Sequence, residues 1–79
     1  MDNNFIPLNH LPIGQTAKVK ELIAEGLIRR RMLDLGIINN TLIEALQPSP
    51  SGDPIAYSIR GAVIALRSEV ASMILVETI

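Results

Sequence analysis

Short apolar stretches recur along this chain between polar, proline or glycine residues, and most of them have the length of β-strands. The clearest is residues 55–60, where Ile55, Tyr57 and Ile59 alternate with other residues and would lie on one face of a strand. Residues 42–46 are more continuously apolar, which predicts burial on much of both faces. The five predicted strands are residues 16–23, 41–46, 55–60, 62–66 and 74–77.

One stretch has a helical period instead. Ile28, Met32 and Leu35 fall at positions i, i+4 and i+7, so they share one helix face, which we expect to face the core. Gly36 follows directly, at the point where a helix commonly ends in a left-handed residue that glycine adopts without a Cβ clash. The pattern therefore predicts one short helix after the first strand, ending at Gly36.

Three further segments carry the residues that turns require. Asn39 and Asn40 predict a tight turn, because asparagine tolerates a left-handed φ better than other non-glycine residues. Gly52 lies in the proline-rich residues 47–54, which we expect to link two antiparallel strands, since proline cannot donate to a strand ladder. Gly61 interrupts two apolar runs, and we expect a bend or bulge there.

The remaining pattern completes a mainly β fold. Ser68 followed by Glu69 predicts an N-cap with an acid in the first turn, and so one helical turn before the last strand. Five short strands with two short helical elements predict a small, partly open five-stranded barrel, because closure removes exposed strand edges. We expect residues 1–79 to form a single domain with a modest core, and residues 1–7 to be flexible.

The composition excludes several classes of protein. The chain contains no cysteine, so it has no disulfide, thiolate nucleophile or thiolate metal site. A net charge of −1 and only two aromatic residues, Phe5 and Tyr57, argue against a nucleic-acid partner. No apolar run approaches the roughly 20 residues that span a bilayer, and the N-terminus lacks the regions of a signal peptide. We therefore expect a cytoplasmic protein without a membrane span.

A cluster of charges lies on the predicted helix. Arg29, Arg30 and Arg31 are adjacent, and Asp34 lies within helical reach of Arg30 and Arg31. One interpretation is a solvated helix face, where exposed ion pairs contribute only about 0–1 kcal/mol. We favour a partner-binding role for all four residues, because three adjacent arginines cannot all pair with Asp34 and arginine is enriched at interfaces.

The residues do not indicate catalytic chemistry. No Ser-His-Asp or Cys-His arrangement is available, no acid–base pair can be argued for Asp34 and Asp53, and the phosphate-binding P-loop motif is missing. His10 is the only histidine, and one ligand makes no metal site, although acidic oxygens could hold a hard cation. We therefore expect no enzyme, no cofactor and no metal ligands. The sequence favours a protein-interaction module, with a metal-binding domain as the alternative.

A set of short motifs runs in a fixed order over residues 8–77. Its members are Leu8, Leu11-Pro12, Gly14, Ala17, Val19, Arg30-Arg31-Met32, Asp34-Leu35-Gly36-Ile37, Gly52-Asp53-Pro54-Ile55, Arg60-Gly61, Ala65-Leu66-Arg67, Ala71, Ile74 and Val76. In this order and spacing they resemble the ferrous-iron transport protein A (FeoA) family. The chain departs from the usual family pattern at Asn39-Asn40, where the family has Pro-Gly.

The resemblance implies a small cytosolic SH3-like barrel that helps ferrous-iron uptake. It implies a partner, ferrous-iron transport protein B, a larger membrane protein whose cytosolic GTPase-containing part the small protein is thought to contact. Similar domains also form the C-terminal part of iron-dependent repressors, so the alternative is a transition-metal-binding or metal-sensing SH3-like domain. The expected function is accessory or regulatory, acting by protein–protein interaction, and we also allow for weak self-association.

Overall fold

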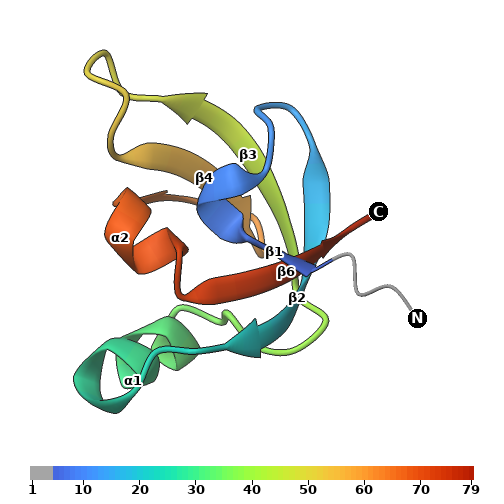
Figure 1. The fold of residues 1–79 in the computed structure, drawn as a ribbon, viewed down its shortest axis with the longest axis vertical. Coiled ribbons are helices and arrows are strands. Elements are labelled where there is room, and N and C mark those ends of the chain that lie inside the picture. Colours follow the sequence, from blue (N-terminus) through green and yellow to red (C-terminus); the bar gives the residue numbers. More distant parts are fainter. Residues whose placement is uncertain (1–4) are drawn as a thin grey trace.

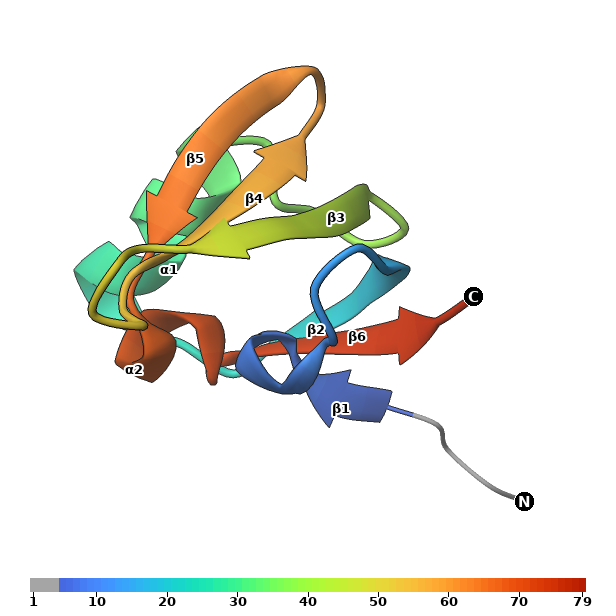
Figure 2. The ribbon, with the colours of Figure 1, turned by 90° about the horizontal axis from the view of Figure 1, so that it is seen from above.

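Residues 5–79 of the computed structural model contain six strands and three short helical segments. In chain order they are β1 (Phe5–Pro7), η1 (Leu8–His10), β2 (Thr16–Leu22), α1 (Gly26–Asp34), β3 (Leu42–Pro48), β4 (Ile55–Ile59), β5 (Ala62–Leu66), α2 (Ser68–Ala71) and β6 (Ile74–Thr78). The strands form one antiparallel sheet in the order β1-β6-β2-β3-β4-β5. Figure 2 shows this sheet curled, with β3, β4 and β5 on one side and β1 and β6 on the other, so the predicted mainly β, partly open architecture is confirmed.

The N-terminal strand corrects one expectation. The sequence pattern predicts five strands and flexible residues 1–7, whereas residues 5–7 form a sixth strand that pairs with β6. A three-residue strand is too short to show a two-residue period, so its pairing with β6 rather than its own pattern makes it a strand. Pro7 is compatible with this position, because β1 is an edge strand and proline is tolerated there. Residues 1–4 lie outside the described part of the chain.

The core lies between the two sides of the curled sheet. Alternate positions of β2, β3, β4 and β6 are buried, as expected for strands with one face on the core. The expectation of burial on both faces of β3 is wrong, because Leu42 is 54% exposed on its outer face. The buried apolar residues are Leu8, Leu11, Ala17, Val19, Ala24, Met32, Ile37, Ile43, Ala45, Tyr57, Ile59, Leu66, Ala71, Ile74 and Val76.

Tyr57 on β4 is the largest fully buried side chain. Its hydroxyl donates a long, 3.5 Å hydrogen bond to the carbonyl oxygen of Leu8, which connects β4 to η1. Burial, and to a lesser extent the negative charge of Asp53, raises the pKa of Tyr57 above its ordinary value of 10.0. Both causes disfavour the tyrosinate, so the folded chain holds this proton more tightly than the unfolded chain.

We expect Tyr57→Phe to reduce the loss of stability above about pH 10. In that range the unfolded chain releases the tyrosine proton while the folded chain keeps it, so a rising pH lowers the free energy of unfolding. Phenylalanine carries no such proton, and the rest of the chain is identical in the two proteins. Urea denaturation of the two proteins between about pH 8 and pH 11 measures the difference, and parallel losses of stability would contradict the expectation.

The end of α1 has the geometry that the sequence predicts. Gly36 has φ +87°, and its N–H donates to the carbonyl of Leu33 at 3.0 Å. The N–H of buried Ile37 donates to the carbonyl of Met32, also at 3.0 Å. These two bonds with a left-handed glycine between them form a Schellman motif, which satisfies the last carbonyls of the helix. Gly36 therefore sets the direction in which the chain leaves α1.

Of the other two predicted turns, one lies between α1 and β3 and the other joins β3 to β4. Asn40 has φ +73° and donates its N–H to the carbonyl of Val19 at 2.7 Å, which fastens the Asn39-Asn40 turn to β2. Gly52, with φ +94°, lies in the loop that joins the antiparallel strands β3 and β4. These positive φ values are the reason that asparagine and glycine occupy the two turns.

The interruption at Gly61 is a hairpin turn rather than the bend or bulge expected from sequence. Ile59 pairs with Ala62, so only Arg60 and Gly61 connect β4 to β5. Both have positive φ, +51° and +83°, as the common two-residue hairpin turn requires. Arginine at the first of these positions hides the usual Asn-Gly or Asp-Gly signal, which explains the wrong prediction.

Candidate protein-binding groove

α1 carries an apolar face that the rest of the fold covers only partly. Figure 1 shows the helix at the margin of the molecule, below α2. Met32 is 2% exposed, but Ile28 is 42% and Leu35 38% exposed. The expectation that all three face the core is therefore wrong for Ile28 and Leu35, although the three do share a face. All three line one groove, and Ile28 and Leu35 are exposed to solvent within it.

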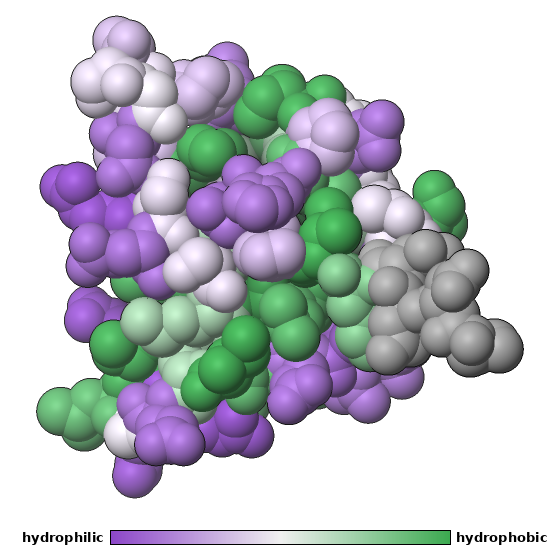
Figure 3. Space-filling view, in the orientation of Figure 1, coloured by the Kyte–Doolittle hydropathy of each residue, from purple (hydrophilic) through white to green (hydrophobic). Residues whose placement is uncertain are grey.

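The groove has a volume of about 440 Å³ and lies between α1, β5 and α2. Most of its lining is apolar side chain, contributed by all three elements. Its lining residues are Ile28, Arg31, Met32, Leu35, Ile64, Ala65, Leu66, Arg67 and Val70. Figure 3 shows hydrophobic surface over α1, at the lower left, directly beside hydrophilic surface. An apolar groove with a polar rim is a common form of protein-binding surface.

The charged residues that line the groove are both arginines. Arg31 is exposed, and within residues 5–79 no carboxylate lies within 4.0 Å of its guanidinium. Arg67 is 68% exposed and lies 3.8 Å from a carboxylate oxygen of Asp53, which is a weak, solvent-screened contact. The groove therefore offers positive charge at its rim and apolar surface within.

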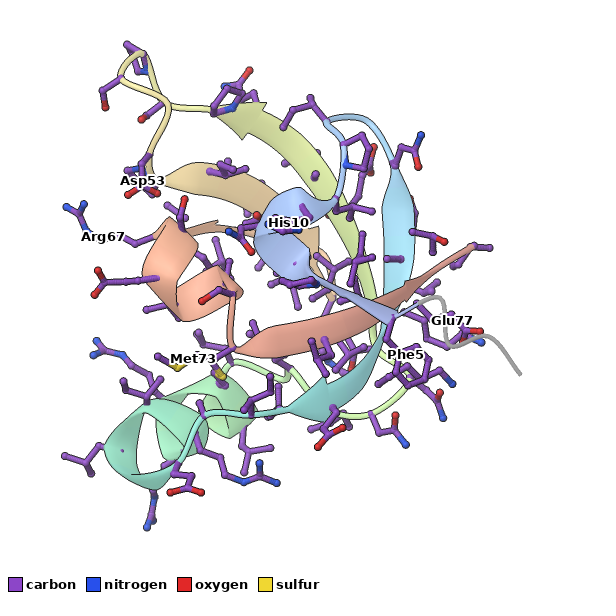
Figure 4. The ribbon with its side chains drawn as sticks, viewed as in Figure 1. Phe5, His10, Asp53, Arg67, Met73 and Glu77 are labelled. Atoms are coloured by element: carbon purple, nitrogen blue, oxygen red, sulfur yellow. The ribbon has the colours of Figure 1, made fainter. Side chains whose placement is uncertain are left out.

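Asp53 holds the α2 side of the groove in place. Its Oδ1 accepts hydrogen bonds from the backbone N–H of Ser68 at 2.8 Å and from the Ser68 hydroxyl at 3.1 Å. Figure 4 shows Asp53 and Arg67 next to each other at the start of α2. The sequence predicts Ser68 as the N-cap, but Arg67 occupies that position and a carboxylate from the β3–β4 loop satisfies the helix end. Periodicity within one segment cannot reveal a cap that comes from another.

The structure separates the four residues predicted to bind a partner. Arg31 lines the groove, whereas Arg29 points to the opposite side of α1 and donates from its Nη1 to the carbonyl of Leu22 at 3.0 Å. Arg30 and Asp34 are exposed and do not line the groove. Among residues 5–79, neither Arg30 nor Arg31 comes within 4.0 Å of a carboxylate oxygen of Asp34. The groove therefore receives one member of the predicted cluster.

The sequence pattern does not reveal the β5 and α2 half of the groove. Ile64, Ala65 and Val70 read as ordinary strand and helix positions, and nothing in their spacing indicates that they face α1. The available signal is the uncharged run from Ala62 to Leu66, which is unusual for a strand at the edge of a sheet.

Candidate metal ligands are scattered over the described residues. Within residues 5–79, no three Asp, Glu or His side chains come together as a metal site would require. His10 is exposed on η1, and Figure 4 shows it on a different element from Asp53 and from Glu77. Glu77 instead forms an ion pair with Lys20, at 3.5 Å. No helix in this part of the chain is long and apolar enough to cross a membrane.

The curled six-stranded sheet and the groove beside α1 define a small SH3-like domain. The chain belongs to the FeoA domain family, whose family model matches residues 6–78. A FeoA-like protein from Clostridium acetobutylicum is 37% identical, with a TM-score of 0.89 over 99% of this chain and 91% of that chain. A zinc complex of Stenotrophomonas maltophilia FeoA, described as a prokaryotic SH3 domain protein, is 26% identical, with a TM-score of 0.80 over 89% of this chain and 87% of that one.

A curated relative joins this kind of domain to a transporter. The Fe(2+) transport protein A/Fe(2+) transporter FeoB fusion protein of Porphyromonas gingivalis is 33% identical over 72 residues, or 91% of this chain. This chain spans only 8% of that relative's length. The family is thus linked to ferrous-iron transport.

The fold also occurs in metal-dependent regulators. A manganese-dependent transcriptional repressor has a TM-score of 0.87 to this chain, covering all of it and 44% of the repressor, at 21% identity. At that identity the likeness concerns the fold alone.

Proposed function

We propose that this chain is an accessory protein of ferrous-iron transport that acts in the cytoplasm, without catalysis, by binding the cytosolic GTPase-containing portion of the transporter FeoB. The partly covered face of α1 is the observation that carries the proposal. Ile28 and Leu35 are too exposed for core residues and border an open groove with Met32. The Porphyromonas gingivalis fusion supports the choice of partner, because it carries the two proteins in one chain.

The chemistry of the groove suits a protein ligand. Methionine and arginine are enriched at protein interfaces, and an apolar centre with a charged rim excludes water from the contact while fixing its orientation. Arg31 can bind a partner carboxylate with both arms of its guanidinium, since no carboxylate among residues 5–79 occupies it. In this proposal Arg31 contributes more to binding than Arg30, which points away from the groove.

A metal-binding or metal-sensing role is the second candidate, and the zinc complex of the Stenotrophomonas maltophilia protein favours it. The described residues give little support for a metal site, because His10 and the acidic side chains are dispersed over different elements. One experiment distinguishes the two proposed functions. It measures the affinity of the chain for the cytosolic portion of FeoB with and without added ferrous or zinc ions. Binding that needs no metal supports the accessory role.

We expect Arg31→Glu to weaken binding to the purified cytosolic portion of FeoB by about tenfold, because like charges would then meet across the interface. Arg30→Glu is the matched control, with the same charge change one residue away and outside the groove, and it should change the affinity several-fold less. Both variants should unfold within about 0.5 kcal/mol of the wild type, since both side chains are exposed. Titration calorimetry at two salt concentrations measures this, and equal effects of the two variants would exclude Arg31 as the groove contact.

A further inference from the structure

The outer edge of β5 is unpaired within residues 5–79. The strand ends the sheet and pairs only with β4. In a hairpin with a two-residue turn, the residues that flank the turn, here Ile59 and Ala62, exchange hydrogen bonds, and every second residue does the same. The N–H and C=O groups of Val63 and Ala65 therefore point outward from the sheet. They form a row of backbone donors and acceptors that β4 does not satisfy.

This edge lacks the features that normally protect an edge strand. β5 reads Ala-Val-Ile-Ala-Leu, with no charge and no proline, and Val63 is 70% exposed. The opposite edge, β1, has only three residues and includes Pro7. Proteins usually shorten, charge or cover their edge strands, because a free apolar edge pairs with other chains.

The groove runs along this edge. Ile64, Ala65 and Leu66 all line it. Successive side chains of a strand point to opposite faces of the sheet, so a groove that touches three consecutive residues must follow the backbone edge between the two faces. The unpaired backbone of β5 and the apolar face of α1 therefore border the same space.

We propose that an extended segment of FeoB binds by adding an antiparallel or parallel strand to the edge of β5. Its backbone pairs with Val63 and Ala65, and apolar side chains at alternate positions enter the groove against Ile28 and Met32. An acidic residue of the segment meets Arg31, because the charged residues that line the groove are arginines. Main-chain hydrogen bonds supply the affinity of such strand addition, and the side-chain positions supply its specificity. The inference rests on the proposed function and adds the binding mode.

Charge favours this ligand over a second copy of the same chain. Two β5 strands paired antiparallel, with Val63 of one opposite Ala65 of the other, would bring Arg67 of each copy beside the Arg60-Gly61 turn of the other. Like charges at both ends of such a pairing are destabilising. An acidic, apolar segment of another protein meets the same edge without that repulsion.

Ala65→Pro tests the binding mode. Proline removes the outward N–H at this position and breaks no bond to β4, so an edge strand tolerates it. Ala65→Val is the matched control, because it adds a side chain of similar size and keeps the N–H. We expect Ala65→Pro to weaken binding to the cytosolic portion of FeoB at least tenfold relative to Ala65→Val. Equal affinities of the two variants would overturn strand addition.

Amide hydrogen exchange of the wild type, followed by NMR, tests the mode without any substitution. In the free protein the amides of Val63 and Ala65 should exchange quickly, whereas those of Ile64 and Leu66 are protected by β4. Saturation with the FeoB portion should slow the first pair at least tenfold. Unchanged exchange in a complex that does form would overturn strand addition but leave the proposed function intact, whereas failure of the wild type to bind overturns both. If exchange of these amides slows when the concentration of the free protein is raised, without FeoB, the edge pairs with a second copy and the proposal is overturned.

Discussion

Replacing Gly36 by valine should lower the free energy of unfolding by more than about 2 kcal/mol. A left-handed conformation costs an L-residue roughly 1–2 kcal/mol, and a β-branched side chain adds to this cost. Gly36 has φ +87°, and a Cβ at this position would lie 2.5 Å from Cδ of Arg60, so this side chain must also move. A domain of this size has only about 5–15 kcal/mol of stability to lose. Thermal and urea denaturation measure the change.

Gly52 provides the control for the backbone term. Its φ is +94°, but a Cβ at this position would meet no atom within 4 Å, so Gly52→Val reports the strain of a positive φ in an open loop. The excess cost at Gly36 then reports the contact with Arg60 and the Schellman bonds at the end of α1. Combining Gly36→Val with Arg60→Ala should recover part of that excess. An unchanged melting temperature for Gly36→Val alone would show that the residue does not adopt the left-handed conformation.

The helix illustrates how far the sequence can predict this protein. The period of Ile28, Met32 and Leu35 places them correctly on one face, and Gly36 marks the helix end. Whether that face is buried depends on what lies opposite, which is β5 and α2, more than 25 residues further along the chain. Periodicity shows which residues point together, but it does not show whether another element covers them. The groove is therefore visible only in the folded chain.

The same limit applies to strand β1, which the sequence pattern does not predict, and to the cap of α2, which it predicts wrongly. β1 exists because β6 offers an edge to three residues with no pattern of their own. α2 is capped by Asp53, a loop residue 15 positions before Ser68, and not by Ser68 itself. In each case a partner distant in sequence determines the local structure. The five longer strands and the loop between β3 and β4 carry their information locally, through alternation, proline and glycine, and they were predictable.

The groove itself offers the sharpest test of function, through two adjacent positions of α1. Ile28 lines the groove and is 42% exposed, whereas Leu27 is 85% exposed and does not line it. Both lie in the first turn of the helix, so an aspartate at either position interacts similarly with the helix dipole. Ile28→Asp and Leu27→Asp therefore make the same chemical change in the same helical context, and they differ mainly in whether the new carboxylate lies in the groove.

We expect Ile28→Asp to weaken binding to the cytosolic portion of FeoB by about thirtyfold or more, equivalent to at least about 2 kcal/mol. The substitution removes apolar contact area from the groove and places a charge where a bound partner would exclude water. The new carboxylate also lies one helical turn from Arg31, so it competes with the partner's acidic residue for the guanidinium of Arg31. Leu27→Asp should bind within about threefold of the wild type, because a residue outside the contact surface contributes little to the binding energy. Circular dichroism and urea denaturation establish that both variants are folded before affinities are compared by calorimetry. If folded Ile28→Asp binds as tightly as Leu27→Asp, the groove beside α1 is not the binding surface.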